Sequence, residues 1–203
     1  MDMRKYSRLL MVAAAALAIL VGVHAQDILH PSDTSALRPP AGAKVAIVEF
    51  ADLECPMCRA QNPVIMQAVK QYHCAWVRYD FPLPEHPWSF QAAVYAKYFE
   101  AKSRDLGYDY ENQVFANQPA IETQADLTQF TQRFAQQHGT TLPFMLDPQG
   151  RFTAEVKSDM ALGDRMGVHE TPTVWVVTNR GYQQVTDFDK LFSMLDQAEA
   201  QTR

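Results

Sequence analysis

Cysteine and basic charge are both scarce in this sequence. Three cysteines among 203 residues are too few for a disulfide framework, and one pair plus one leftover fits a catalytic pair better. Lys and Arg number 18 against 23 Asp and Glu, which gives a formal net charge of −5. Such a surface repels phosphate backbones, so nucleic-acid binding is not expected. Internal repeats and low-complexity segments are absent as well.

The apolar run near the N-terminus is too short to cross a bilayer easily. It covers residues 9–23, which is 15 residues, whereas a spanning helix needs roughly 18 to 20. Three basic residues precede the run. Small residues stand at its last position, Val23, and two positions later at Ala25. We therefore expect residues 1–25 to be a secretory signal cleaved near Ala25, with a retained membrane anchor less favoured. That export would place the protein in the periplasm or outside the cell, where disulfide chemistry is possible.

The most informative stretch is an apolar, β-branched run at residues 44–50 that leads into Cys55-Pro56-Met57-Cys58. A helix beginning at these cysteines would present free N–H groups and a positive dipole end, which stabilise a thiolate at Cys55. Cys58 lies three residues further on, on the same helical face and within reach for a disulfide. The spacing predicts a redox-active disulfide, Cys55–Cys58, and no other cofactor.

The elements around the pair predict an α/β sheet. Residues 44–50 are apolar enough for a central strand covered on both faces. The helix from the cysteines runs to about residue 72 and contains Pro63, which should kink it. Residues 75–81 alternate as a second strand. A strand, helix and strand in this order form a parallel pair, with the cysteines at the carboxyl end of the first strand.

Between about residues 87 and 166 the sequence has helical signals and no convincing strand. We expect four helices: one with Pro87 at its first position, a short one over 110–116, one over 123–138, and one that ends near Gly167. A buried strand over 173–177, a short strand over 182–185 and a closing helix with Asp187 as a possible cap follow. The chain therefore predicts an all-helical insertion between two halves of a sheet.

This order resembles the thioredoxin fold with a helical insertion, as in DsbA-like thiol–disulfide oxidoreductases of the bacterial envelope. Three motifs carry the resemblance: Glu49-Phe50 before the cysteine pair, Phe81-Pro82-Leu83 with His86, and residues 167–173 around Thr171-Pro172. The resemblance implies a thioredoxin-like domain of residues 43–85 and 167–203 with a helical insertion domain at 86–166. Residues 26–42, rich in proline, would form a surface lead-in.

The resemblance also implies roles for single residues. Cys55 would be the exposed nucleophile and Cys58 the buried resolving thiol. Glu49 matches the family's buried acid, which could exchange a proton with Cys58 at a pKa raised by burial. The Thr171-Pro172 bond would be cis, beside the pair, and leave backbone free to pair with extended substrate. The expected site therefore comprises four catalytic positions, Cys55, Cys58, Glu49 and Pro172, and three substrate-binding ones, Pro56, Met57 and Thr171.

One position departs from the strongly oxidising members of this group, which have histidine where this chain has Met57. A methionine cannot donate a hydrogen bond to the Cys55 thiolate, and the neighbouring Glu54 adds a negative charge. We therefore expect a Cys55 pKa that is lowered, but toward the upper part of the roughly 3.5 to 7.5 range of activated thiols. A less stable thiolate means a more stable disulfide and weaker oxidising power.

Other interpretations of the cysteines remain open. Cys55, Cys58, His73 and Cys74 have spacings that suggest zinc, although the last two would lie at the far end of the helix, so no metal site is expected. A static structural disulfide is a second alternative. Cys74 is expected to be a buried small apolar residue or else an additional redox-sensitive thiol. His86 and His169 are interpreted as surface or capping residues.

The sequence thus predicts an exported, monomeric oxidoreductase that forms disulfides in cysteine-containing exported proteins. A membrane redox partner of the DsbB or vitamin K epoxide reductase type would reoxidise the pair, by the family resemblance. A monomer is favoured because dimeric isomerases carry an extra N-terminal domain, and we do not expect such a domain in this sequence. Two alternatives stay open: a disulfide reductase or isomerase of the same fold, and a non-enzymatic peptide-binding module with an inert cysteine pair.

Overall fold

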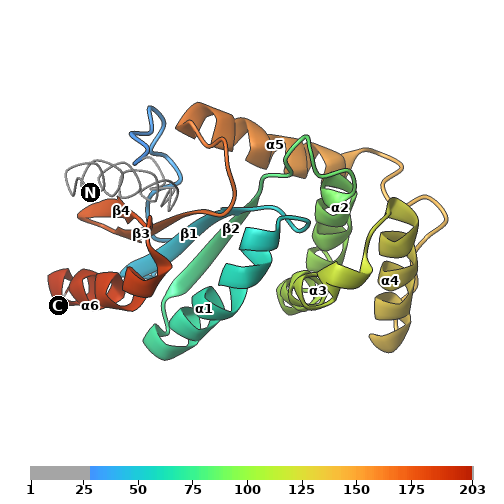
Figure 1. The fold of residues 1–203 in the computed structure, drawn as a ribbon, viewed down its shortest axis with the longest axis horizontal. Helices are drawn as coiled ribbons and strands as arrows, with labels where there is room; N and C mark the ends of the chain where they lie inside the picture. Colours follow the sequence, from blue (N-terminus) through green and yellow to red (C-terminus); the bar gives the residue numbers. More distant parts are fainter. Residues whose placement is uncertain (1–27, 203) are drawn as a thin grey trace, which may run out of the picture.

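The computed structural model describes residues 28–202, so the predicted signal at residues 1–25 lies outside the described part. A four-stranded mixed sheet forms the centre, in the order β2-β1-β3-β4 (Figure 1). The strands are β1 (Val45–Ala51), β2 (Ala75–Asp80), β3 (Thr173–Thr178) and β4 (Gly181–Gln184). The predicted parallel pairing of β1 with β2 is confirmed, and β3 runs antiparallel to both β1 and β4.

Within the described residues, six α-helices surround or extend this sheet. They are α1 (Pro56–Tyr72), α2 (Ser89–Glu100), α3 (Arg104–Asn117), α4 (Gln124–Gln137), α5 (Arg151–Met166) and α6 (Leu191–Gln201), with short 3-10 helices η1 (Gln118–Ala120) and η2 (Phe188–Lys190). None of the helices within residues 28–202 combines the length and apolar character that crossing a membrane requires. The predicted fold class, a sheet whose halves are separated by a helical insertion, is confirmed.

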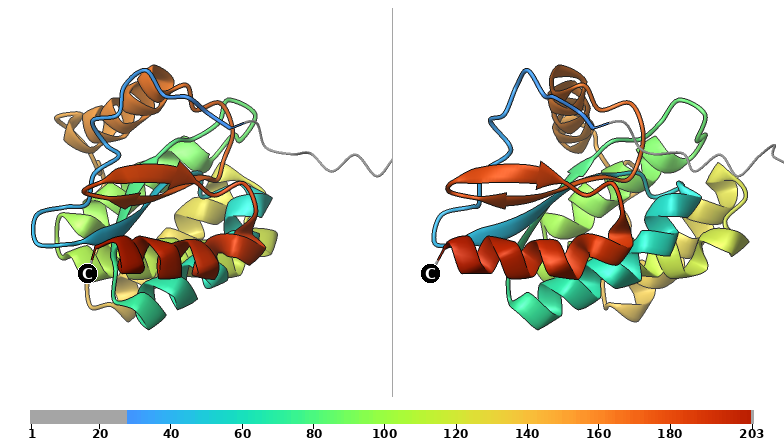
Figure 2. Two further views of the ribbon diagram at one scale, coloured as in Figure 1. Left: turned by 90° about the vertical axis from the view of Figure 1, so that its left-hand side faces the viewer. Right: turned by 60° about the vertical axis from the view of Figure 1, so that its left-hand side comes forward.

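The sheet is covered on both faces because side chains of β1 alternate between two apolar clusters. Val45 and Ile47 pack with residues of α1 and α6, including Ile65 and Leu195. The intervening side chains of β1 pack on the opposite face with the α5 residue Met166. Figure 2 shows α1 and α6 on one side of the sheet and α5 on the other. All seven residues of β1 are buried, as expected for a central strand.

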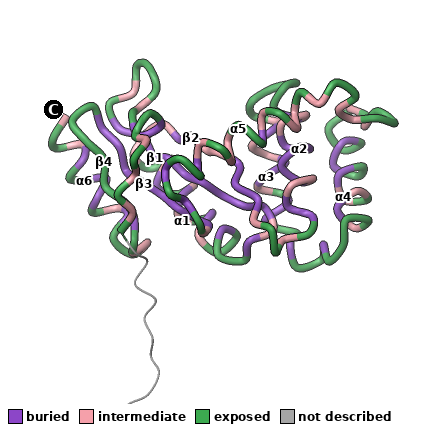
Figure 3. The backbone as a smooth tube through the Cα atoms, turned by 90° about the horizontal axis from the view of Figure 1, so that it is seen from above, coloured by how far each residue is buried: buried purple, intermediate pink, exposed green. Residues whose placement is uncertain are grey.

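The helices α2, α3 and α4 enclose a separate aromatic core beyond the β2 edge of the sheet. Phe99, Tyr110 and Phe134 pack against one another in tilted and edge-to-face arrangements, with ring centroids 4.8 to 5.1 Å apart. The same cluster contains both Cys55 and Cys58. In Figure 3 the strands β1 and β3 are buried along their length, whereas the outer turns of α4 are exposed. The cysteine pair therefore lies where the sheet and the helical block meet.

Three local predictions are corrected. The expected short helix at 110–116 is longer and begins at Arg104, because the Ser103 hydroxyl accepts from the Leu106 N–H and caps it. The helix expected to start at Pro87 starts at Ser89. The lead-in has no helix or strand over its described residues, but it is not only a surface segment, since Ala36 and Leu37 are buried against the α5 face of the sheet.

Candidate active site

Cys55 occupies the N-cap of α1, directly after the loop that follows β1. Pro56 takes the first helical position, where a missing N–H costs nothing. Cys58 follows within the first turn and is fully buried. The expected exposure of Cys55 is corrected: this residue is only 5% exposed, because the Thr171 backbone and the helical block cover it. Its neighbour Met57 is 55% exposed and forms the open rim of the site.

The loop between β1 and α1 is fixed to both cysteines through Asp52. The Asp52 N–H points at Cys58 Sγ at 3.5 Å, and the Asp52 carbonyl accepts from the Cys55 N–H at 3.2 Å. From the helical block, Gln118 Nε2 donates to the carbonyls of Leu53 and Cys55 at 2.9 and 3.1 Å. Together these hydrogen bonds hold both cysteines in place.

The Thr171–Pro172 loop lies directly against the pair, 116 residues away in sequence. This peptide bond is cis, as predicted. The Cys55 thiol donates a hydrogen bond to the Thr171 carbonyl at 3.2 Å. The chain thus brings together three of the four predicted catalytic positions, Cys55, Cys58 and Pro172, along with the three predicted substrate-binding residues. Their roles in substrate binding stay predictions.

The two cysteines have pKa values displaced in opposite directions. The pKa of Cys55 is lowered to about 6, chiefly by a hydrogen bond from the Cys58 thiol, with further help from Thr171 and the backbone N–H groups of Cys58 and Met57; burial opposes it. This value matches the expectation of a moderately activated thiol. Burial and the neighbouring Cys55 charge raise the pKa of Cys58 well above its usual value of 9.0. At neutral pH the arrangement therefore has one thiolate and one thiol.

Glu49, in the middle of β1, is 1% exposed, as the predicted buried acid should be. Burial raises its pKa, while the charge of Arg78 and a hydrogen bond from Trp76 Nε1 at 2.9 Å act against this rise. The charge of Glu49 in turn raises the pKa of Cys58. A buried carboxyl coupled to the buried thiol has the properties that a proton relay needs, and the relay itself stays a prediction.

Sequence reasoning did not find the buried charge cluster beside this acid. Arg78, on β2, approaches Glu111 at 2.6 Å and Asp80 at 3.5 Å. Lys97, on α2, joins Asp80 at 3.2 Å and Asp159 at 3.0 Å. These residues come from β2, α2, α3 and α5, so only the tertiary fold unites them. The alternation of Arg78 and Asp80 with apolar residues on β2 was the available signal.

Two further charged residues beside the pair were also missed or misplaced. His86, interpreted from sequence as a surface or capping residue, bonds through Nδ1 to the buried Asp52 carboxylate at 2.7 Å. Glu54 was expected to disfavour the Cys55 thiolate, but its carboxylate accepts from the Trp88 N–H at 2.7 Å. Burial raises the pKa of Glu54, while the hydrogen bond from the Trp88 N–H acts against this rise. His169 lies on the proline loop, is exposed, and bonds to the Gly167 carbonyl.

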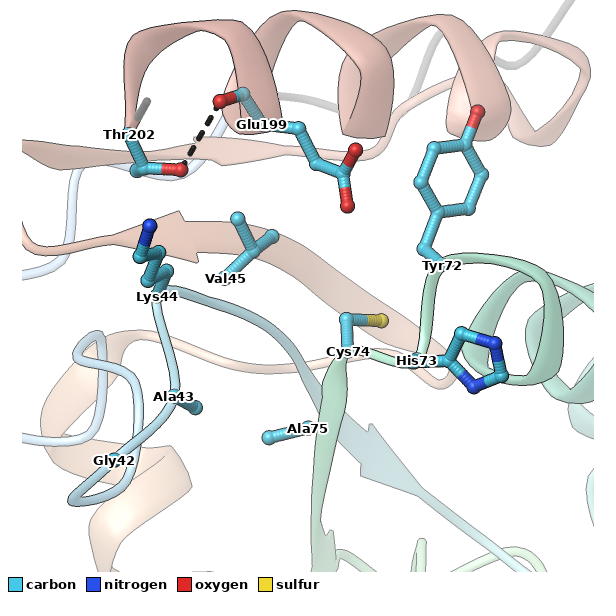
Figure 4. A pocket seen from close by; sticks show the side chains of 10 residues that line it. All are labelled: Gly42, Ala43, Lys44, Val45, Tyr72, His73, Cys74, Ala75, Glu199 and Thr202. Atoms are coloured by element: carbon cyan, nitrogen blue, oxygen red, sulfur yellow. Dashed lines mark hydrogen bonds between the residues drawn. The ribbon is translucent and has the colours of Figure 1, made fainter.

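The third cysteine, Cys74, is remote from the pair. It precedes β2, whereas Cys55 follows β1, and these parallel strands place the two at opposite ends of the sheet. Cys74 borders a cavity of about 350 Å³ and faces Glu199 of α6 across it (Figure 4). Burial and the Glu199 charge raise the Cys74 pKa to about 11, so the thiol is unreactive near neutral pH.

The same separation bears on the zinc alternative. His73 and Cys74 line the cavity at the far end of the sheet, so one ion cannot bind them together with Cys55 and Cys58. Within the described residues, no group of three or more His, Cys, Asp or Glu side chains is arranged to hold a metal ion. The cysteine pair is best understood through its own thiol chemistry.

A buried cysteine pair at the start of a helix, facing a cis-proline loop, is the arrangement of a thioredoxin-like protein. The sequence matches the thioredoxin family over residues 40–197, and the chain belongs to that family. Disulfide bond formation protein D of Bacillus subtilis is 25% identical over 160 residues, which cover 73% of this chain and 70% of that protein.

Three further matches show how far this likeness extends. A Na(+)/H(+) antiporter NhaA 3 of Salinispora tropica is 28% identical over 156 residues, but these cover 74% of this chain and only 23% of the antiporter. Among solved structures, Wolbachia pipientis alpha-DsbA1 has a TM-score of 0.65 at 15% identity, over 82% of this chain and 92% of that one. Oxidised BdbD of Bacillus subtilis has a TM-score of 0.62 at 19% identity, over 84% and 97%. The structural matches establish the shared fold.

Proposed function

We propose that this protein is an exported thiol–disulfide oxidoreductase that introduces disulfides into substrate proteins. The observation that carries the proposal is the asymmetry of the pair: the Cys55 pKa is lowered to about 6, whereas that of Cys58 is raised well above 9.0. An inert structural disulfide needs no such asymmetry, whereas exchange chemistry needs a good leaving thiolate at one sulfur. The Bacillus subtilis relative is named disulfide bond formation protein D, which supports the same direction.

The proposed reaction begins with the Cys55–Cys58 disulfide. A substrate thiolate attacks Cys55 Sγ, the bond between the cysteines breaks, and Cys58 leaves and takes up a proton, for which the buried Glu49 is the candidate donor. A second substrate thiolate then attacks the substrate sulfur of this mixed disulfide and releases Cys55 as a thiolate. The substrate loses two electrons and the pair gains them. The lowered pKa of Cys55 makes it a good leaving group in the second step.

Substrate would lie in an extended conformation against the rim formed by Pro56, Met57 and the Thr171–Pro172 loop. Both Pro56 and Met57 are exposed, and the proline at 172 has no N–H of its own to satisfy. The reduced pair would be reoxidised by a membrane protein of the DsbB or vitamin K epoxide reductase type. A reductase role would use the same sulfurs with the electrons moving in the opposite direction, and an isomerase role would use them with no net transfer of electrons.

The test is oxidation of a dithiol peptide by the disulfide form of the full chain. The wild-type protein should convert the peptide to its disulfide in an equimolar reaction, and Cys55→Ser should abolish this. Cys74→Ser is the matched control and should keep the wild-type rate, because Cys74 lies at the other end of the sheet. The binding-module alternative would instead hold if the wild type oxidises no peptide and Cys55→Ser binds the peptide as well as the wild type does.

A further inference from the structure

His86 lies on the loop between β2 and α2 and is held by the carboxylate of a buried aspartate. Its Nδ1 lies 2.7 Å from Asp52 Oδ2, and its backbone N–H donates to the Leu83 carbonyl. The His86 side chain is 19% exposed and that of Asp52 is fully buried. An imidazole paired in this way with a buried carboxylate favours its protonated form.

Asp52 connects this imidazole to both cysteines. Its backbone N–H faces Cys58 Sγ at 3.5 Å, and its carbonyl accepts from the Cys55 N–H at 3.2 Å. The loop that carries His86 is also tied to the residue before Cys55, since the Trp88 N–H donates to Glu54 Oε2 at 2.7 Å. His86 is thus built into the wall of the site through two short bonds.

The negative charge of Asp52 is shared among several donors. Besides His86, the N–H groups of Glu54 and Leu83 donate to its carboxylate, each at 2.7 Å. Burial acts to lower the pKa of His86, but the hydrogen bond and charge of Asp52, together with the charges of Cys55 and Glu54, raise it. The groups facing His86 from the β1–α1 loop and the helix start are therefore Asp52, Glu54 and Cys55. Because interactions between two charges are reciprocal, a Cys55 thiolate that stabilises His86 as a cation is itself stabilised by it.

We propose that the His86 imidazolium, held in place by the Asp52 carboxylate, supplies positive charge that stabilises the Cys55 thiolate, in place of a histidine between the cysteines, where this chain has Met57. The inference rests on the proposed function and deepens it, since it identifies the group that sets the reactivity of the nucleophile. His86 acts through its charge on the Cys55 thiolate, as a positioning residue, and does not need to contact substrate. Oxidation of Cys55 removes the thiolate, so the affinity of His86 for its proton falls when the disulfide forms.

The first experiment titrates Cys55 in the reduced full chain by thiolate absorbance at 240 nm. His86→Gln should raise the Cys55 pKa by about half a unit to one unit, because one nearby cation is lost. His138→Gln is the matched control: His138 is also paired with an aspartate, Asp109 at 3.3 Å, but it lies in the helical block after α4. A shift in His86→Gln alone supports the proposal, and an unchanged or lowered Cys55 pKa overturns it.

A second measurement needs no substitution at His86. Its own pKa, followed by NMR, should be lower in Cys55→Ser than in the reduced wild type, by about the same amount as the first shift. Equal His86 pKa values in the two proteins would overturn the proposal even if His86→Gln failed to fold. Both titrations are independent of turnover. If the wild type has no oxidase activity, the proposed function is contradicted. If the wild type is active but His86→Gln leaves the Cys55 pKa unchanged, only this inference is contradicted.

Discussion

Met57 is one of the two residues between the cysteines, and its side chain directly influences their chemistry. Met57 is exposed beside Cys55 and offers no hydrogen-bond donor, so the lowered Cys55 pKa depends on the Cys58 thiol, the Thr171 side chain and the helix backbone, in addition to the proposed charge of His86. A histidine there would add a donor and, when protonated, a positive charge. The absence of a donor at this position is consistent with a Cys55 pKa that is lowered only moderately.

Met57→His should therefore lower the Cys55 pKa below about 6 by roughly one unit, because an adjacent cation stabilises the thiolate. Thiolate absorbance at 240 nm as a function of pH measures the change. Met145→His provides the control, since Met145 is another exposed methionine but lies in the loop before α5. An identical titration curve for Met57→His and the wild type would contradict this explanation.

At this scale, sequence reasoning predicted the residues that local motifs contain. Cys55, Cys58 and Glu49 lie within ten residues of one another, and Thr171-Pro172 is a recognisable dipeptide. Gln118 and Arg78 were not predicted, because their importance arises from contacts with Leu53, Cys55 and Glu111 across 33 to 65 residues. The motif around His86 was noted, but its bond to Asp52 depends on how two loops meet in space.

Among the elements, α5 packs tightly against the aromatic face of the sheet at one glycine. A Cβ added at Gly163 would lie 2.5 and 2.6 Å from ring atoms of Phe81 and 3.2 Å from Phe50. Both rings are buried and stack edge to face with centroids 6.2 Å apart, so neither can move freely. Glycine at this position lets the helix lie directly on the aromatic face of the sheet.

Gly163→Ala should accordingly destabilise the protein by about 1–3 kcal/mol, as overpacking of a core does. Urea unfolding followed by circular dichroism measures the loss. Gly181→Ala is the control, because a Cβ there meets no atom within 4 Å. The packing explanation fails if the two variants have the same unfolding midpoint.

A second contact between elements is the ion pair of Arg78 on β2 with Glu111 on α3. The Arg78 side chain is 3% exposed, so Arg78→Met would leave buried carboxylates without their cation and should cost about 3–5 kcal/mol near neutral pH. Burial already raises the Glu111 pKa to about 7. In the Arg78→Met variant, Glu111 can take up a proton at low pH, which removes the unpaired buried charge. The destabilisation should therefore be larger at pH 8 than at pH 5. An equal loss at both pH values would contradict this explanation.

The elements themselves were predicted well where caps and periodicity agreed. Thr123 with Asp126 forms a capping box at α4, and Gly167 ends α5 with a positive φ of 78°. The start of α3 was missed because its first turn, with Leu106 followed by Gly107, has no apolar stripe to reveal it. Tertiary packing against Glu100 favours the glycine there, since a Cβ would lie 2.8 Å from Glu100 Cβ.

For the whole molecule, the lowered Cys55 pKa links redox state to stability. Folding lowers this pKa from 9.0 to about 6, so the reduced form gains stability as pH rises above 6 and loses it as pH falls through 6. The disulfide form has no such titration. Between pH 6 and pH 8.5, the free energy of unfolding of the reduced form should rise relative to that of the disulfide form. Urea unfolding of both forms at several pH values measures this, and a pH-independent difference would contradict it.

The central claim is that the Cys55–Cys58 pair donates its disulfide to substrates, and the equilibrium reduction potential of the pair against glutathione tests it most directly. With a Cys55 pKa of about 6, we expect a value between about −120 mV, typical of DsbA, and about −270 mV, typical of thioredoxin. A potential at or below the thioredoxin value, or a pair whose redox state does not respond to glutathione, would contradict it.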